Sequence, residues 1–165
     1  MARYFLQDLV FVREHREDKA SKAVNAARRL VLEAEQVVQQ RKKELEDYKV
    51  WRVQEEARLI EKIMRQKVKL GDITDLRLEI IGMREKEFEY IDQLRKAEGE
   101  LDKAKENLEQ ARLAHKKATQ ELEKLIEHRE LWRREEYFEQ ERMMDLESED
   151  FRLMPALDES MATDN

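Results

Sequence analysis

Histidine and carboxylate side chains are the groups in this chain that could support catalysis or metal binding. The sequence has three histidines, 39 Asp and Glu residues and no cysteine. None of His15, His115 and His128 has a glutamate three positions earlier, so the Glu-x-x-His pairs of a helical di-iron site are missing. Neither a Gly-rich phosphate loop nor a nucleophile motif occurs. We read the carboxylates as solvated helix faces and expect no enzymatic activity, no metal and no cofactor.

The composition predicts long helices. Of the 165 residues, 44% are charged and 41% hydrophobic, and there are only three glycines and one proline. So few Gly and Pro residues leave room for few turns, and alternating charged and aliphatic residues are typical of coiled coils.

Several classes of protein are disfavoured by the same composition. No apolar run approaches the ~18 residues that cross a bilayer, and the first residues lack the apolar core of a secretory signal. The net charge of -6 argues against general nucleic-acid binding. The absence of cysteine fits a cytoplasmic protein.

Two apolar seams predict two helices, one over about residues 5–70 and one over about residues 74–146. The first seam alternates in steps of three and four, interrupted by Arg41 and Arg52: Ala20, Val24, Ala27, Val31, Ala34, Val38, Leu45 and Tyr48. The second is a regular heptad pattern: Leu94, Ala97, Leu101, Ala104, Leu108, Ala111, His115, Ala118, Leu122 and Leu125. Such a pattern over several heptads predicts a coiled coil, in which His115 would be a polar residue that sets the register.

The break between the helices is expected at residues 70–75. Gly71 suits the left-handed position that closes a helix, and Asp72 or Thr74 can cap the next one. The predicted fold is therefore all-α: a two-helix antiparallel coiled-coil hairpin of residues 1–147, with a short turn near residues 70–75. Ala27 would then lie near Ala118, and Leu45 near Leu101. Residues 148–165, which contain Pro155 and many acids, are predicted to be a disordered acidic tail.

Charge favours folding back. Residues 1–70 hold 17 Lys/Arg and 12 Asp/Glu, whereas residues 71–144 hold 15 Lys/Arg and 20 Asp/Glu. Segments of opposite net charge attract each other, although exposed pairs contribute only ~0–1 kcal/mol each and cannot drive the pairing.

The aromatic residues gather in two regions of the predicted hairpin. The open end, where the two chain termini meet, holds Tyr4, Phe5, Phe11, Trp132, Tyr137 and Phe138. The hinge half, nearer the turn, holds Tyr48, Trp51, Phe88 and Tyr90. Two helices have too little core to bury them all, so some should be exposed and could bind a partner. Alternatively, they seal the ends of the coil.

Short motifs at both ends resemble the type III secretion central-stalk family (YscO/FliJ type). They are Met1-Ala2-Arg3-Tyr4-x-Leu6-x-x-Leu9, Arg13-Glu14-x-Arg16-x-Asp18-Lys19-Ala20, the turn at Gly71, and Glu127-His128-Arg129-Glu130-Leu131-Trp132-Arg133-Arg134-Glu135-Glu136. The resemblance spans roughly residues 1–145.

The resemblance implies a non-enzymatic central stalk in the cytoplasm, peripheral to the secretion apparatus at the inner membrane. Such a stalk inserts into the ring of the secretion ATPase, promotes its assembly or activity, and contacts the export-gate protein; some members also handle secretion chaperones. It would be a monomer when free, with no membrane insertion. The ring contact would involve Tyr4, Phe5, Arg13, Arg133 and Arg134. The export-gate contact would involve Tyr48, Trp51, Phe88 and Tyr90.

An alternative function is a generic structural scaffold or a chaperone-binding adaptor without an ATPase partner. A scaffold should self-associate through its seam, whereas a stalk should sediment as an elongated monomer. A helix lying on a membrane surface is disfavoured, because charges of both signs surround both helices.

Overall fold

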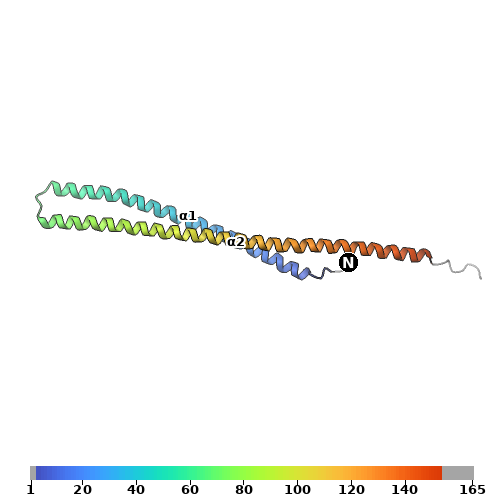
Figure 1. The fold of residues 1–165 in the computed structure, drawn as a ribbon. Helices are drawn as coiled ribbons and strands as arrows, with labels where there is room; N and C mark the ends of the chain where they lie inside the picture. Colours follow the sequence, from blue (N-terminus) through green and yellow to red (C-terminus); the bar gives the residue numbers. More distant parts are fainter. Residues whose placement is uncertain (1–2, 154–165) are drawn as a thin grey trace, which may run out of the picture. The chain divides into compact units, whose positions relative to one another are not determined.

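The computed structural model describes residues 3–153, which form two long helices. Helix α1 spans Gln7–Met64 and helix α2 spans Leu70–Leu153. The two helices run antiparallel, joined by one short connection (Figure 1). The predicted all-α hairpin is confirmed. Within the described part of the chain, neither helix has a stretch long and apolar enough to cross a membrane.

The chain divides into two compact units. The turn unit consists of residues 20–115 and contains the connection between the helices. The terminal unit combines residues 3–19 with residues 116–153. Each unit is built from a segment of α1 and a segment of α2.

The connection between the helices comprises residues 65–69, a few residues earlier than predicted. The Asp72 carboxylate accepts a hydrogen bond from the Lys69 backbone N–H at 2.9 Å, and the Asp72 N–H donates to the Lys69 carbonyl at 3.1 Å. Asp72 thus caps α2 from inside its first turn, as the third residue of a capping box does. Gly71 lies within this first turn of α2 and does not close α1, so the predicted role of Gly71 is wrong.

The core of the turn unit follows the predicted seams. Val24, Val31 and Leu108 form a buried cluster, against which Ala27, Leu101, Ala104 and Ala111 pack. Val38, Leu45 and Tyr48 continue the buried stripe along α1. Small alanines between larger aliphatic residues allow the helices to approach closely and still exclude water.

The earlier turn shifts the pairing of the helices from the predicted one. Leu101, expected near Leu45, packs instead against the cluster that contains Val24 and Val31. Further toward the turn, Tyr48 lies against Tyr90. Moving the turn toward the N-terminus moves every residue of α1 opposite an earlier residue of α2, so the seam residues stay buried but meet different partners.

In the terminal unit, α2 continues beyond the residues that α1 covers. Val10 is completely buried, and Tyr4 is buried just before α1 begins. Every residue from 137 to 153 is exposed. Helix α2 reaches Leu153, so the predicted acidic tail is helical over residues 148–153, because no residue there breaks a helix before Pro155. Residues 154–165 of the predicted tail lie outside the described residues.

Substitution of the glycines inside α2 is expected to stabilise the protein. An added Cβ would meet no atom within 4 Å at Gly82 or Gly99. Because alanine loses less backbone freedom than glycine on forming a helix, Gly99→Ala should raise the free energy of unfolding by about 0.5–1 kcal/mol, and Gly82→Ala similarly. Urea unfolding followed by circular dichroism measures the change. A lower free energy of unfolding for both variants would contradict the open environment of these positions.

Candidate protein-binding sites

At the open end, a cluster of rings around Tyr4 packs the segment before α1 against α2. The Tyr4 ring lies 5.2 Å from the Phe5 ring, 5.4 Å from Trp132 and 5.8 Å from His128, measured between ring centroids. The Tyr4 hydroxyl is hydrogen-bonded to Nδ1 of His128 at 2.6 Å. These contacts join the segment before α1 to the side of α2, so Tyr4 stabilises the open end from inside.

The predicted ring-contact residues therefore differ in accessibility. Tyr4 is buried, and Arg13 forms an ion pair with Glu121 across the two helices. Phe5 is 69% exposed, and Arg133 and Arg134 are exposed on α2. Only the exposed three can present most of their side chain to another protein.

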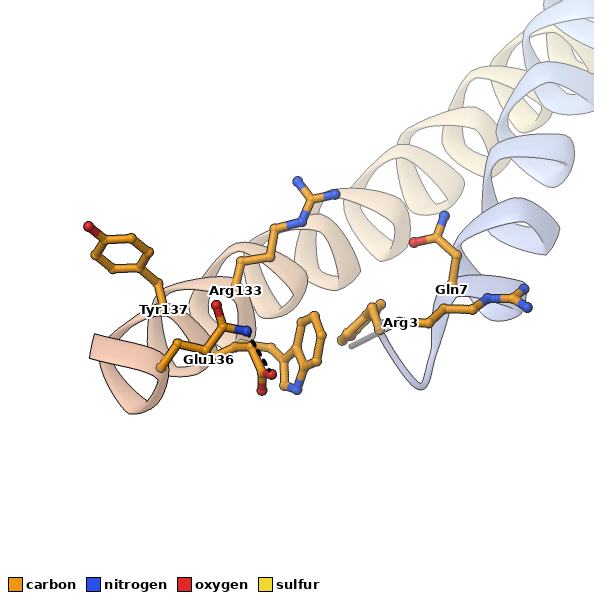
Figure 2. A pocket seen from close by; sticks show the side chains of 8 residues that line it. Arg3, Gln7, Arg133, Glu136 and Tyr137 are labelled. Atoms are coloured by element: carbon orange, nitrogen blue, oxygen red, sulfur yellow. Dashed lines mark hydrogen bonds between the residues drawn. The ribbon is translucent and has the colours of Figure 1, made fainter. Parts of the chain in front are cut away.

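A pocket of about 580 Å³ adjoins this cluster. Arg3, Tyr4 and Gln7 line one side, and α2 contributes the other with Trp132, Arg133, Glu136, Tyr137 and Gln140 (Figure 2). Arg133 is held by an ion pair with Glu130 at 3.1 Å, in which both side chains are about half exposed. The pocket combines aromatic surface with guanidinium groups, which is a composition common in protein-binding hot spots.

The hinge half contains a second aromatic cluster, centred on Tyr48. The Tyr48 ring stacks on Tyr90 with centroids 4.7 Å apart, and Trp51 lies 5.5 Å away. The Tyr48 hydroxyl donates a hydrogen bond to the Met83 backbone carbonyl at 2.7 Å. Burial raises the pKa of Tyr48, and the neighbouring Tyr90 raises it further. Tyr48 therefore remains a neutral donor that joins α1 to α2.

The four aromatic residues predicted for the gate contact are not all brought together. Trp51 is 48% exposed beside the buried Tyr48, and Tyr90 is half-buried. Phe88 is 66% exposed, and no aromatic ring contacts it in residues 3–153. The hinge half thus presents two separate exposed aromatic residues, Trp51 on α1 and Phe88 on α2.

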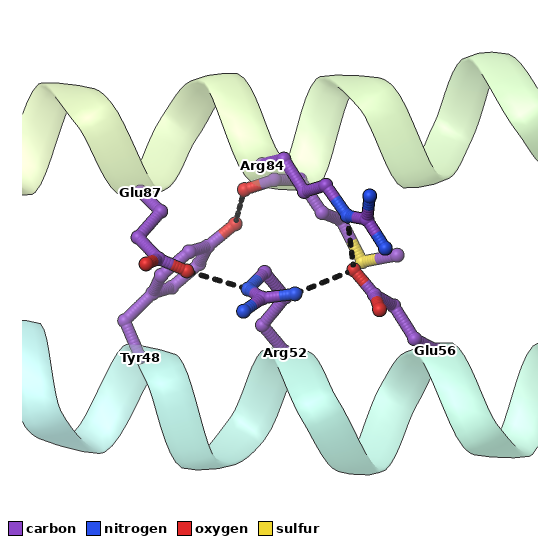
Figure 3. Close-up of polar contacts among 6 residues, drawn as sticks. Tyr48, Arg52, Glu56, Arg84 and Glu87 are labelled. Carbon is purple, nitrogen blue, oxygen red and sulfur yellow. Dashed lines mark hydrogen bonds and ion pairs between the residues drawn. The ribbon is translucent and has the colours of Figure 1, made fainter.

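Next to Tyr48 lies a network of charged residues that the sequence analysis did not predict. Arg52 donates to Glu87 at 2.5 Å across the helices and to Glu56 at 2.8 Å along α1, and Arg84 lies 3.3 Å from Glu56 (Figure 3). The side chains of Arg52, Glu56 and Glu87 are all less than one-fifth exposed. Arginine at an apolar seam position was the available signal, since a charge there needs an opposite charge on the facing helix.

The pKa of Glu56 reflects this network. Burial by itself raises it, but the hydrogen bonds from Arg52 and Arg84 outweigh burial, and the pKa lies below the ordinary value of 4.5. A carboxylate with a lowered pKa in the folded state stabilises the protein above its unfolded-state pKa. This stabilisation is lost as the pH falls through the folded-state pKa.

Removal of this carboxylate should change the pH dependence of stability. The melting temperature of Glu56→Gln is expected to lie below that of the unmodified protein at about pH 7, and the gap should close toward about pH 3. The pKa values of Glu44 and Glu55 are also lowered by their arginine partners. Both residues titrate in the variant and in the unmodified protein, so their contributions cancel in the difference between the two melting temperatures. Glu98→Gln, at an exposed site of the same unit, is the matched control. A gap that is the same at both pH values would contradict the prediction.

The arrangement offers surfaces for binding. Among residues 3–153, His, Asp and Glu residues form no group that could hold a metal ion. Trp51, Phe88, Arg133 and Arg134 lie on continuous helices, whose rigid backbones hold them at fixed positions, whereas Phe5 lies in the short segment before α1.

The fold and these surfaces define a class: an all-α two-helix hairpin with exposed aromatic side chains at two levels. The model of the type III secretion protein YscO family matches residues 6–153. The chain belongs to this family and is a type III secretion protein.

One solved structure agrees with this assignment, and a second has the same fold. The type III secretion protein YscO from Vibrio parahaemolyticus is 28% identical, with a TM-score of 0.81 over 88% of this chain and 92% of that one. A putative YscO homolog, CT670, from Chlamydia trachomatis is 24% identical, with a TM-score of 0.76 over 92% and 93% of the two chains, which shows a shared fold. Comparison with curated proteins found no match.

Proposed function

We propose that the protein is a non-enzymatic central stalk of a type III secretion export apparatus. Its open end enters the ring of the secretion ATPase and promotes assembly or activity of the ring, and its hinge half contacts the export gate. The protein acts in the cytoplasm, at the inner-membrane side of the apparatus, and is a monomer when free. The observation that carries this proposal is family membership over residues 6–153, combined with an antiparallel hairpin of two unbroken helices.

The ring contact is assigned to the exposed part of the open end. Phe5 supplies apolar surface, and Arg133 and Arg134 supply positive charge on the neighbouring α2. Tyr4 and Arg13, predicted for the same contact, are engaged with His128 and Glu121, so they shape the surface through folding. A partner surface with carboxylates around an apolar site would complement this composition.

A nucleotide-hydrolysis assay tests the ring contact. The purified protein should stimulate ATP hydrolysis by the cognate secretion ATPase, and the double variant Phe5→Ala/Arg134→Ala should lose most of that stimulation. The control Leu32→Ala/Arg29→Ala removes an exposed apolar residue and an exposed arginine from the turn unit, and should stimulate like the unmodified protein. If the unmodified protein neither binds nor stimulates the ATPase, the stalk assignment is wrong.

The gate contact is tested by pull-down with the cytoplasmic part of the export-gate protein. Trp51→Ala and Tyr90→Ala should weaken capture, whereas Leu32→Ala, at an exposed position farther from the turn, should not. Phe88→Ala reports whether the exposed ring on α2 takes part. Capture that is unchanged in the Trp51 and Tyr90 variants would remove this assignment. Sedimentation of the free protein as a dimer would favour a scaffold.

A further inference from the structure

The last part of α2 is a helix on which no other segment of residues 3–153 packs. We call residues 137–153 the α2 extension; all of them are exposed, and α2 runs past the beginning of α1 in the terminal unit (Figure 1). Most helices in proteins gain their stability from packing of an apolar face. The extension carries such a face, and no part of residues 3–153 packs on it.

One face of the α2 extension combines apolar side chains with carboxylates. Tyr137, Met144 and Phe151 recur every seven residues and so lie on one side of the helix. Met144 and Phe151, which is 82% exposed, line a shallow pocket of about 730 Å³ together with Glu147, Ser148 and Asp150. Tyr137 lines the neighbouring pocket beside Trp132. The face is therefore continuous with the pocket at the open end.

The excess of acidic residues in the α2 extension favours a positively charged helix as the partner of this face. The extension contains six acids, Glu139, Glu141, Asp145, Glu147, Glu149 and Asp150, and only two bases, Arg142 and Arg152. Rows of charge beside an apolar stripe determine which helix pairs with which, because like charges repel and opposite charges attract across the contact.

Two occupants from this protein itself are disfavoured by the same rule. A second copy of the α2 extension would bring acids against acids. Residues 154–165 contain three acids and no Lys or Arg, so this segment has no positive side chain to offer the face.

We propose that the α2 extension is a docking site for an amphipathic helix of another protein, one with a row of Lys or Arg residues beside its apolar face. The apolar side of that helix packs on Met144 and Phe151, and its positive charges face Glu147 and Asp150. This contact adds to the ring and gate contacts proposed above and does not depend on either.

Binding of two designed peptides to the full-length protein tests the proposal. The probes are a Leu/Lys amphipathic helix of about three heptads and the same helix with Glu in place of Lys. Fluorescence anisotropy should show that the Lys peptide binds at least about tenfold more tightly, and that Met144→Ser/Phe151→Ser weakens it by about tenfold. The charge reversal Glu147→Lys/Asp150→Lys should weaken the Lys peptide and strengthen the Glu peptide.

Matched variants separate this site from general attraction to an acidic protein. Asp102→Lys/Glu106→Lys makes the same change in net charge at exposed positions of the turn unit and should leave binding of the Lys peptide within about twofold. All substituted side chains are exposed, so helicity and melting temperature should stay close to those of the unmodified protein. The proposal would be overturned if the two peptides bound with equal affinity, or if Asp102→Lys/Glu106→Lys weakened the Lys peptide as much as Glu147→Lys/Asp150→Lys does. Self-association of the protein that Met144→Ser/Phe151→Ser abolishes would overturn it as well.

Discussion

Tyr48→Ala is expected to lower the free energy of unfolding by about 3 kcal/mol, more than truncation of any leucine in the seam. The substitution removes a buried ring that stacks on Tyr90 at 4.7 Å and contacts Trp51. It also leaves the Met83 carbonyl without the hydrogen bond that it accepts from the Tyr48 hydroxyl. Two helices supply few other atoms to fill the space, although they can collapse part of it.

Two further variants separate the causes of this loss. Tyr48→Phe keeps the ring and removes only the hydroxyl, so it should cost about 1 kcal/mol. Phe88→Ala truncates an aromatic residue of the same hinge half that is two-thirds exposed, and should change stability by less than about 0.5 kcal/mol. Urea unfolding followed at the helical circular-dichroism band measures all three. If Tyr48→Ala and Phe88→Ala had equal effects, the Tyr48 cluster would not be part of the core.

Leu108→Ala is expected to cost about 2 kcal/mol, the second largest effect. Leu108 is 8% exposed and is the contribution of α2 to the buried cluster with Val24 and Val31. Its neighbours Ala104 and Ala111 are small, so the helices can close part of the cavity, which places the cost at the low end of the range for such truncations.

The matched control for Leu108 is another leucine of the same helix. Leu113 is 60% exposed, and Leu113→Ala should stay within about 0.5 kcal/mol of the unmodified protein. The midpoint of guanidinium unfolding reports both variants, with an unchanged denaturant slope showing that only stability has changed. A larger loss for Leu113→Ala than for Leu108→Ala would mean that the seam lies on a different face of α2.

The hairpin and its seams could be predicted from local pattern. Val24, Val31, Val38 and Leu45 recur every seven residues and are buried, and the leucines and alanines of α2 face them as the heptads indicate. Spacing suffices here because a helix places residues seven apart on one face whatever its partner is. Family membership was also anticipated, since the end motifs are short-range sequence features.

The position of the turn could not be predicted from turn residues alone. Gly71 indicated the break, yet the chain turns over residues 65–69, which contain no Gly or Pro. The capping contact between Asp72 and Lys69 and the packing of the seam determine where the helices part. Tertiary packing overrides a single glycine because one glycine costs only about 1 kcal/mol within a helix.

The sequence by itself determined the fold class, the two seams and the identity of the aromatic residues. Only the tertiary structure decided which of those aromatics stabilise the core and which face solvent. Tyr4 and Tyr48 are buried, whereas Phe5 and Phe88 are exposed. Residue type alone does not distinguish the buried rings from the exposed ones. Burial depends on which residue of the other helix lies opposite, and the position of the turn sets that pairing. Tyr4, for example, contacts His128, which lies more than a hundred residues away in the sequence. The same cause produced the α2 extension, because a turn at residues 65–69 makes α2 the longer helix and leaves its last turns without a packing partner among the described residues.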